Sequence, residues 1–149
     1  MPALRPVAAM PAVACALLPA SAAGEVRKSP SPMVDRINEV RRGHGLRPAR
    51  YSRSLSGSSA RFARRLARTQ RFTHASRIGA SGRFSSLGEV LALMRGWEVR
   101  RADTLAYWLR SPSHRAVLLS PAFRYVGAAR VRGHFGGTPT MFWTVQLGR

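Results

Sequence analysis

The chain has 149 residues, with 25 Lys or Arg against 6 Asp or Glu, so its formal net charge is +19. This length excludes a multidomain protein, because one domain usually comprises about 100–200 residues. With 45% hydrophobic and 21% charged residues, the chain is expected to fold around its own core, and neither a metal nor a disulfide is needed for folding.

Residues 1–23 have the layout of a secretory signal peptide. Arg5 precedes an apolar stretch over residues 7–18, and small residues follow, which predicts cleavage after Ala22 or Ala23. Cys15, the single cysteine, lies inside this segment, so the mature chain would have no disulfide, as suits a bacterial exported protein. An uncleaved membrane tether and a disordered tail are the alternatives.

The positive charge is distributed rather than gathered in one basic arm. Arginine pairs recur at 41–42, 64–65 and 100–101, and aromatic residues do not alternate with them as stacking platforms for bases would require. A solvated surface is the simplest interpretation, and adhesion to an anionic cell-envelope surface is the main alternative. We expect no specific nucleic-acid partner.

The first half of the domain is predicted to be helical. A linker over residues 24–31 leads to a helix over residues 32–42, with Ser31 as its cap and Pro32 at its first position. A second helix is expected over residues 52–70, with apolar residues on one side and arginines on the solvent side. Residues 71–88 have no periodicity and read as a long irregular loop, of a length that is often functional.

Two short helices and a hairpin are predicted for the second half. The helices cover residues 102–110 and a segment that begins at Ser111 and stops before Pro121. Alternation with a period of two then predicts strands at 123–132 and 140–147, joined by a turn over 133–139. Helices followed by strands indicate an α+β fold.

Several short motifs occur in an order that resembles a known family. They are I-N-E-V-R at residues 37–41, F-T-H at 72–74, G-E at 88–89, W-L-R-S-P-S-H-R at 108–115 and F-W-T-V-Q-L-G at 142–148. This order resembles the CAP superfamily of cysteine-rich secretory, antigen 5 and pathogenesis-related proteins, and above all its disulfide-free bacterial, SCP-like branch. The resemblance covers residues 33–148, within a domain that we place at residues 32–149.

The resemblance implies an exported three-layer α-β-α sandwich with a central cleft, and it implies which residues line that cleft. By position these are His74, Glu89 and His114, together with Ser111, which stands where many eukaryotic members have a second glutamate. Val90 stands where an asparagine commonly follows the G-E pair. These two departures leave one carboxylate in the cleft and remove a polar side chain that would help to hold the glutamate loop.

The chemistry of these residues leaves two interpretations open. His114 lies in the first turn of a predicted helix, whose positive end favours a neutral imidazole. Two neutral imidazoles and a carboxylate can bind Zn²⁺ in a hydrolase, with His74 and His114 as ligands and Glu89 as general base. Alternatively, His74 and His114 bond to Glu89 and to neighbouring backbone as a structural polar network.

Four further residues have simpler interpretations. His44 and His134 are expected at the surface, beside glycines. Trp97 is interpreted as a core residue, although it could line a groove. Glu98 is the one spare acid that could replace the missing cleft glutamate.

Two classes of function follow. The first is a non-enzymatic exported binding module, secreted or associated with the cell envelope, whose cleft holds a small lipid, glycan or peptide. The second is a metal-dependent hydrolase with a His/Glu/His cleft and zinc as the cofactor. A binding module needs a concave apolar groove near the cleft residues, whereas a hydrolase needs the three residues to converge. We expect a monomer.

Overall fold

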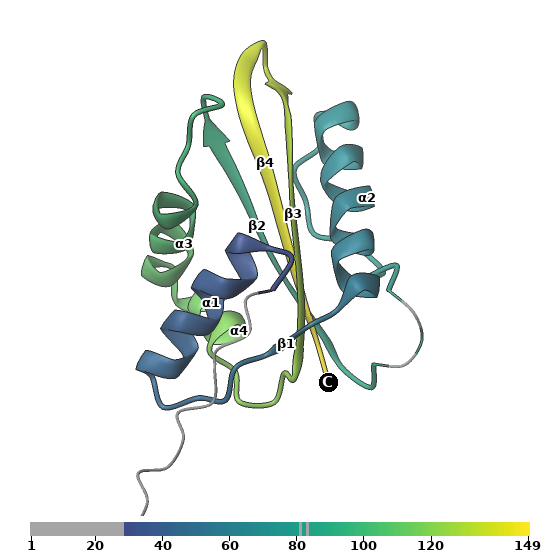
Figure 1. The fold of residues 1–149 in the computed structure, drawn as a ribbon. Coiled ribbons are helices and arrows are strands. Elements are labelled where there is room, and N and C mark those ends of the chain that lie inside the picture. Colours follow the sequence, from purple (N-terminus) through teal and green to yellow (C-terminus); the bar gives the residue numbers. More distant parts are fainter. Residues whose placement is uncertain (1–28, 81, 83) are drawn as a thin grey trace, which may run out of the picture.

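A mixed sheet of four strands organises the protein in a computed structural model that describes residues 29–80, 82 and 84–149 (Figure 1). The strands are β1 (Arg50–Tyr51), β2 (Leu87–Arg95), β3 (Tyr125–Phe135) and β4 (Thr138–Gly148), in the spatial order β1-β3-β4-β2. β1 is parallel to β3, and the other pairs are antiparallel. The predicted signal peptide, Cys15 and most of the predicted linker lie in residues 1–28, outside the described residues.

Helices cover both faces of the sheet. Helix α2 (Arg53–Thr69) packs on one face against β3 and β4, while α1 (Pro32–Gly43), α3 (Arg101–Arg110) and α4 (Pro112–Leu118) cover the other (Figure 1). This arrangement confirms the predicted α-β-α sandwich. In the described part of the chain no helix combines the length and the apolar character that crossing a membrane would require.

The larger part of the core lies between the sheet and the three-helix layer. Trp108 of α3 is fully buried there, and its Nε1 donates to the Leu91 carbonyl of β2 at 2.8 Å. On the α2 face a smaller apolar cluster forms around Leu66, Leu91 and Phe142. Because side chains alternate along a strand, β2 supplies residues to both layers.

Helix α2 agrees closely with its predicted bounds. The Ser52 side chain accepts from the Leu55 amide at 3.2 Å as the N-cap, and Gln70 ends the helix with a left-handed φ of 56°. At the first helix, however, Ser31 is the N-cap residue but makes no side-chain capping bond. Instead the Ser29 amide donates to the Asp35 carboxylate at 2.7 Å.

Strand β2 is the largest difference from the predicted elements. Sequence periodicity had placed residues 71–88 in an irregular loop, whereas the strand begins at Leu87 and runs to Arg95. Its centre, Val90 and Leu91, is buried on both faces, so the alternation that marks a half-buried strand is missing. The hairpin is also longer than predicted, because the turn is limited to Gly136 and Gly137, with φ of 56° and 77°.

Arg41 of α1 is buried. Its pairing with Arg42 in the sequence had instead suggested a side chain exposed to solvent. Arg41 is 1% exposed and donates to four backbone carbonyls, those of Arg47, Leu118, Ser120 and Phe123. Burial, followed by repulsion from Arg124, lowers its pKa. Arg41 therefore joins α1 to the end of α4 and to the segment that leads into β3.

Candidate functional site

Glu89 of β2 is a buried carboxylate held by three partners from the chain itself. Its side chain is 5% exposed. Oε1 accepts from the Ala75 amide at 3.0 Å and lies 3.1 Å from His74 Nδ1, while Oε2 accepts from Gln146 Nε2 at 2.8 Å. Glu89 therefore joins the irregular segment after α2 to the central strand β4.

The sheet register explains how these partners meet. Glu89 is the cross-strand partner of Gln146, so both side chains project from the α2 face of the sheet. The next residue, Val90, projects to the opposite face and is fully buried in the larger core. Glu89 thus lies in a strand rather than a loop, and the asparagine that Val90 replaces is not needed to hold it.

His74 lies on the outer side of this arrangement. Its side chain is 61% exposed, and Glu89 is the side chain it contacts. Segment 71–80 approaches β2 over Ala75, so that His74 borders solvent. The structure therefore brings together two of the predicted cleft residues, His74 and Glu89.

His114 projects from α4 and is partly buried. Its Nδ1 is a buried atom without a hydrogen-bond partner among the described residues, and its ring centroid lies 6.2 Å from that of Tyr107. Burial lowers the pKa of His114, and repulsion from His74 lowers it further. The direction agrees with the predicted neutral imidazole, but burial is the leading cause rather than the helix N-terminus.

Ser111 takes no part in the Glu89 network. It is the N-cap residue of α4 without a side-chain capping bond, and its hydroxyl lies 3.2 Å from that of Ser113. Among residues 29–80, 82 and 84–149, no group of three or more His, Cys, Asp or Glu side chains is arranged to hold a metal ion. The donors in the described chain therefore do not fit a zinc site with three protein ligands.

The other candidate residues lie elsewhere. His44 and His134 are both exposed, as predicted. His44 is the C-cap residue of α1, whereas His134 lies in β3 rather than in the predicted turn. The core interpretation of Trp97 is wrong: it is 40% exposed, donates to the Gly133 carbonyl at 3.2 Å and packs against His134. Glu98, whose side chain is 95% exposed, lies 3.6 Å from Arg132 rather than in the site.

A groove of about 400 Å³ borders His74. It runs between α2 and residues 71–76, and we call it the α2 groove; its lining residues are Phe62, Arg65, Leu66, Thr69, Arg71, Thr73, His74, Ala75 and Ser76. Glu89, Ser111 and His114 are not among them. Sequence reasoning had assigned the arginines of α2 to solvent alone, because the segment that closes the groove has no periodicity of its own.

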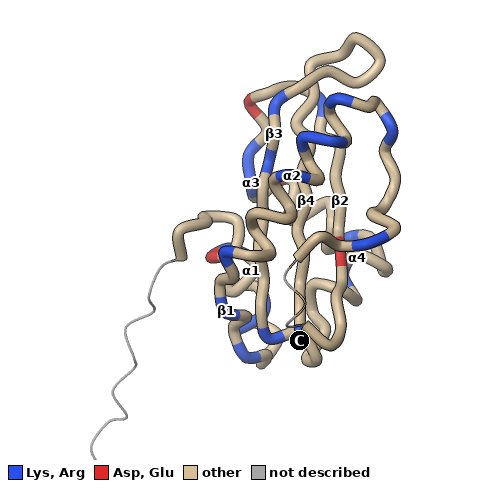
Figure 2. Tube along the Cα trace, turned by 90° about the vertical axis from the view of Figure 1, so that its right-hand side faces the viewer, with Lys and Arg blue, Asp and Glu red and all other residues tan. Residues whose placement is uncertain are grey.

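Gln146 was also missed, although the sequence contains a signal for it. It is a fully buried amide in β4, a strand that is otherwise mostly apolar near its end. A polar residue at such a position needs a buried partner, and Glu89 supplies one. The surrounding surface is strongly basic: Figure 2 shows Lys and Arg spread over the length of the molecule, with few acidic residues among them.

Solved structures share this fold. An outer surface protein from Borrelia burgdorferi aligns with a TM-score of 0.65 at 20% identity, over 78% of this chain and 89% of that protein. An extracellular protein containing an SCP domain from Bacillus anthracis aligns at 0.61 and 21% identity, over 78% of this chain and 39% of that one. A cysteine-rich secretory protein from Staphylococcus aureus aligns at 0.53 and 17% identity, over 78% of this chain and 37% of that one.

At these identities the structural likeness establishes the fold and not the activity. No protein of curated function matches the sequence significantly. Residues 34–147, however, match the sequence profile of the CAP family, which confirms the resemblance carried by the short motifs. The chain belongs to the cysteine-rich secretory protein (CAP) family.

Proposed function

We propose that the protein is an exported, non-enzymatic binding module of the cell envelope, which holds a small lipid, glycan or peptide ligand in the α2 groove. Two neighbouring features carry the proposal: the α2 groove, and the carboxylate of Glu89, whose oxygens are both hydrogen-bonded within the protein. The groove lies next to His74, as a binding module requires, whereas Glu89 is buried and already engaged by chain partners.

The lining of the α2 groove favours an amphipathic ligand. Phe62 and Leu66 supply apolar surface, while Arg65 and Arg71 supply positive charge at the same groove. Its volume of about 400 Å³ lies in the range of about 300–1,000 Å³ that is usual for small-ligand sites. Among the three ligand classes, these features suit an anionic lipid better than a neutral glycan. The positive surface would keep the protein near an acidic envelope.

The engaged state of Glu89 argues against the hydrolase alternative. A general base must reach a water or substrate proton, but here both oxygens of the carboxylate have partners from the chain. In addition, the donors in the described chain do not fit a zinc site with three protein ligands.

Palmitate titration of the full chain tests the proposal. Thr73→Trp places a bulky side chain in the α2 groove and should abolish saturable palmitate binding. Ala122→Trp is the matched control, because Ala122 is exposed and lines no described cavity, so binding should be retained. Absence of binding by the wild type, or equal loss in both variants, would contradict the proposal.

Zinc titration tests the alternative. We expect no stoichiometric Zn²⁺ binding by the wild type and no release of soluble fragments from peptidoglycan with added zinc. Stoichiometric binding that is lost in a His74→Ala/His114→Ala variant, together with fragment release that Glu89→Gln abolishes, would replace the binding module with a hydrolase.

A further inference from the structure

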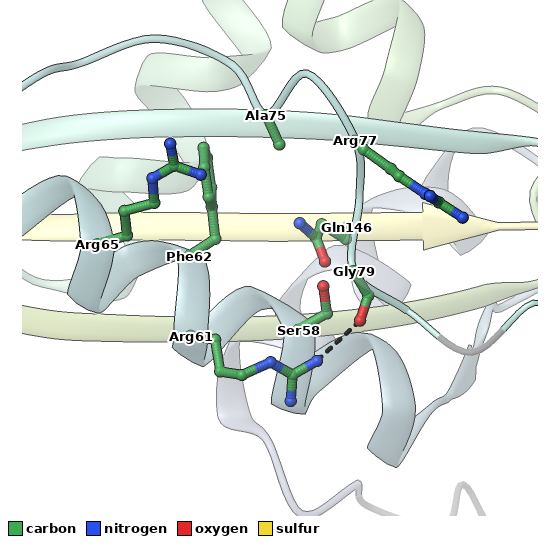
Figure 3. Close-up of a pocket in the computed structure, with 8 residues that line it drawn as sticks. All are labelled: Ser58, Arg61, Phe62, Arg65, Ala75, Arg77, Gly79 and Gln146. Carbon is green, nitrogen blue, oxygen red and sulfur yellow. Dashed lines mark hydrogen bonds between the residues drawn. The ribbon is translucent and has the colours of Figure 1, made fainter.

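A second, smaller cavity adjoins the α2 groove on the same face of the sheet. It measures about 180 Å³ and is lined by Ser58, Arg61, Phe62, Arg65, Ala75, Arg77, Gly79 and Gln146 (Figure 3). We call it the arginine pocket. It shares Phe62, Arg65 and Ala75 with the α2 groove, so the two cavities are neighbours with a common wall.

Three arginines line the arginine pocket, and Figure 3 shows that the Arg77 side chain is directed away from Ser58 and Gln146. Arg61 donates through Nη2 to the Gly79 carbonyl at 2.8 Å, which holds the segment across the pocket (Figure 3). The guanidinium groups of Arg65 and Arg77 have no partner in the described part of the chain, and no described carboxylate lines the pocket. Glu89 lies behind the wall, held by Ala75 and Gln146. The charged side chains that line the pocket are therefore all cationic, and the nearby Glu89 carboxylate is engaged by two of the lining residues.

The floor of the pocket is neutral and polar. The Ser58 hydroxyl and the Gln146 amide point toward one another there (Figure 3). Because Gln146 Nε2 is used by Glu89, its Oε1 faces the other way, and this buried oxygen has no hydrogen-bond partner among the described residues. Gln146 is fully buried, so an unsatisfied acceptor at this place is costly. A donor from a ligand, such as a hydroxyl group, would satisfy it.

From these features we infer that the arginine pocket binds a phosphorylated polyol of the glycerol phosphate type. Guanidinium groups bind phosphate oxygens through paired hydrogen bonds, and the Ser58 hydroxyl and Gln146 oxygen match the polyol hydroxyls. The volume of about 180 Å³ is below the usual range for a whole small ligand, so it suits a head group. The inference rests on the proposed function in one respect: an apolar chain attached to the head group would lie in the α2 groove. Binding of the head group itself does not require that chain.

Titration with sn-glycerol 3-phosphate tests the site in the full chain at about 0.15 M salt, where loose surface attraction is screened. The wild type should bind saturably, more tightly than inorganic phosphate, and glycerol alone should not bind. Arg65→Gln should weaken binding about tenfold, which corresponds to one lost charge-assisted contact. Arg64→Gln is the matched control: Arg64 is the neighbouring exposed arginine on α2 and lines neither cavity.

A second variant tests the floor of the pocket. Ser58→Ala should remove the preference for glycerol phosphate over inorganic phosphate while leaving phosphate binding in place. Absence of saturable binding by the wild type, or equal weakening by Arg64→Gln and Arg65→Gln, would overturn the inference, because the attraction would then belong to the basic surface as a whole.

Two further experiments are needed. One distinguishes the possible sources of the glycerol phosphate, and the other distinguishes failure of the arginine pocket from failure of the proposed function. If glycerol 3-phosphate displaces the protein from phosphatidylglycerol vesicles, a lipid head group is a source of the ligand. If it binds without displacing the protein, the source is a soluble or polymer-linked glycerol phosphate. The arginine pocket is a binding site in both cases.

Thr73→Trp should retain glycerol 3-phosphate binding while losing palmitate binding. In the wild type, absence of palmitate binding alone thus contradicts the proposed function, and absence of glycerol 3-phosphate binding alone contradicts the pocket.

Discussion

Replacing Arg41 by methionine should destabilise the fold strongly, because it removes a buried cation that four carbonyls hold. Two of its bonds, to Leu118 at 2.8 Å and to Phe123 at 3.3 Å, are buried, and the other two are partly accessible to water. A hydrogen bond to a charged group contributes about 1.5–3 kcal/mol, so the two buried bonds together give about 3–6 kcal/mol. Methionine fills much of the volume but leaves the carbonyls unpaired.

Urea unfolding followed by tryptophan fluorescence measures this loss, because Trp108 and Trp143 are buried and report on the core. Arg42→Met is the matched control: Arg42 is exposed at the next helical position and should change stability by less than about 0.5 kcal/mol. Arg41→Lys keeps the charge but not the planar fork, and should fall between the two. If Arg41→Met lost no more stability than Arg42→Met, the buried bonds of Arg41 to the Leu118 and Phe123 carbonyls would not stabilise the fold.

Three further predictions concern the site and its support. Gly127→Ala should cost more than about 3 kcal/mol in thermal unfolding, because its Cβ would overlap the α2 backbone, whereas Gly43→Ala, with open space around it, should be neutral or stabilising. Glu89→Ala should cost about 2–4 kcal/mol and raise hydrogen exchange at the Ala75 amide, which loses its acceptor; unchanged exchange would contradict the network. Because the folded pKa of His114 is lowered, its contribution to stability is present above the unfolded pKa of about 6.5 and is lost as pH falls; urea titrations of His114→Leu should show a weaker acid dependence.

Local signals predicted much of the fold. Helix α2 and the β3–β4 pair have strong periodicities of 3.6 and 2, and both were found near their predicted positions. Strand β2 was missed because its centre is buried on both sides. Arg41 was assigned to solvent because two adjacent basic residues usually indicate an exposed position. The carbonyls of Leu118, Ser120 and Phe123 that accept from it are distant in sequence, so no local pattern indicates these bonds.

The candidate site was predicted in part, and for a different reason. His74 and Glu89 were predicted as site residues from the motif resemblance alone. They are 15 positions apart, one in an irregular segment and the other in a strand that was not predicted, so no local pattern indicates that they are in contact. The Glu98 replacement was not found, because residues near the end of β2 lie beside the hairpin, where Arg132 meets Glu98. The two cavities could not be predicted, because one wall of each is the segment after α2, whose path depends on long-range bonds.

That segment connects the two proposed binding regions. At one end it is held to β2, where the Ala75 amide donates to Glu89, and at the other end to α2, where Gly79 accepts from Arg61. Ala75 lines both the α2 groove and the arginine pocket, so a shift of the segment changes both cavities at once. Glu89 can therefore have a structural role that does not involve catalysis. As a buried hydrogen-bond acceptor, it holds in place the segment that forms one wall of both cavities.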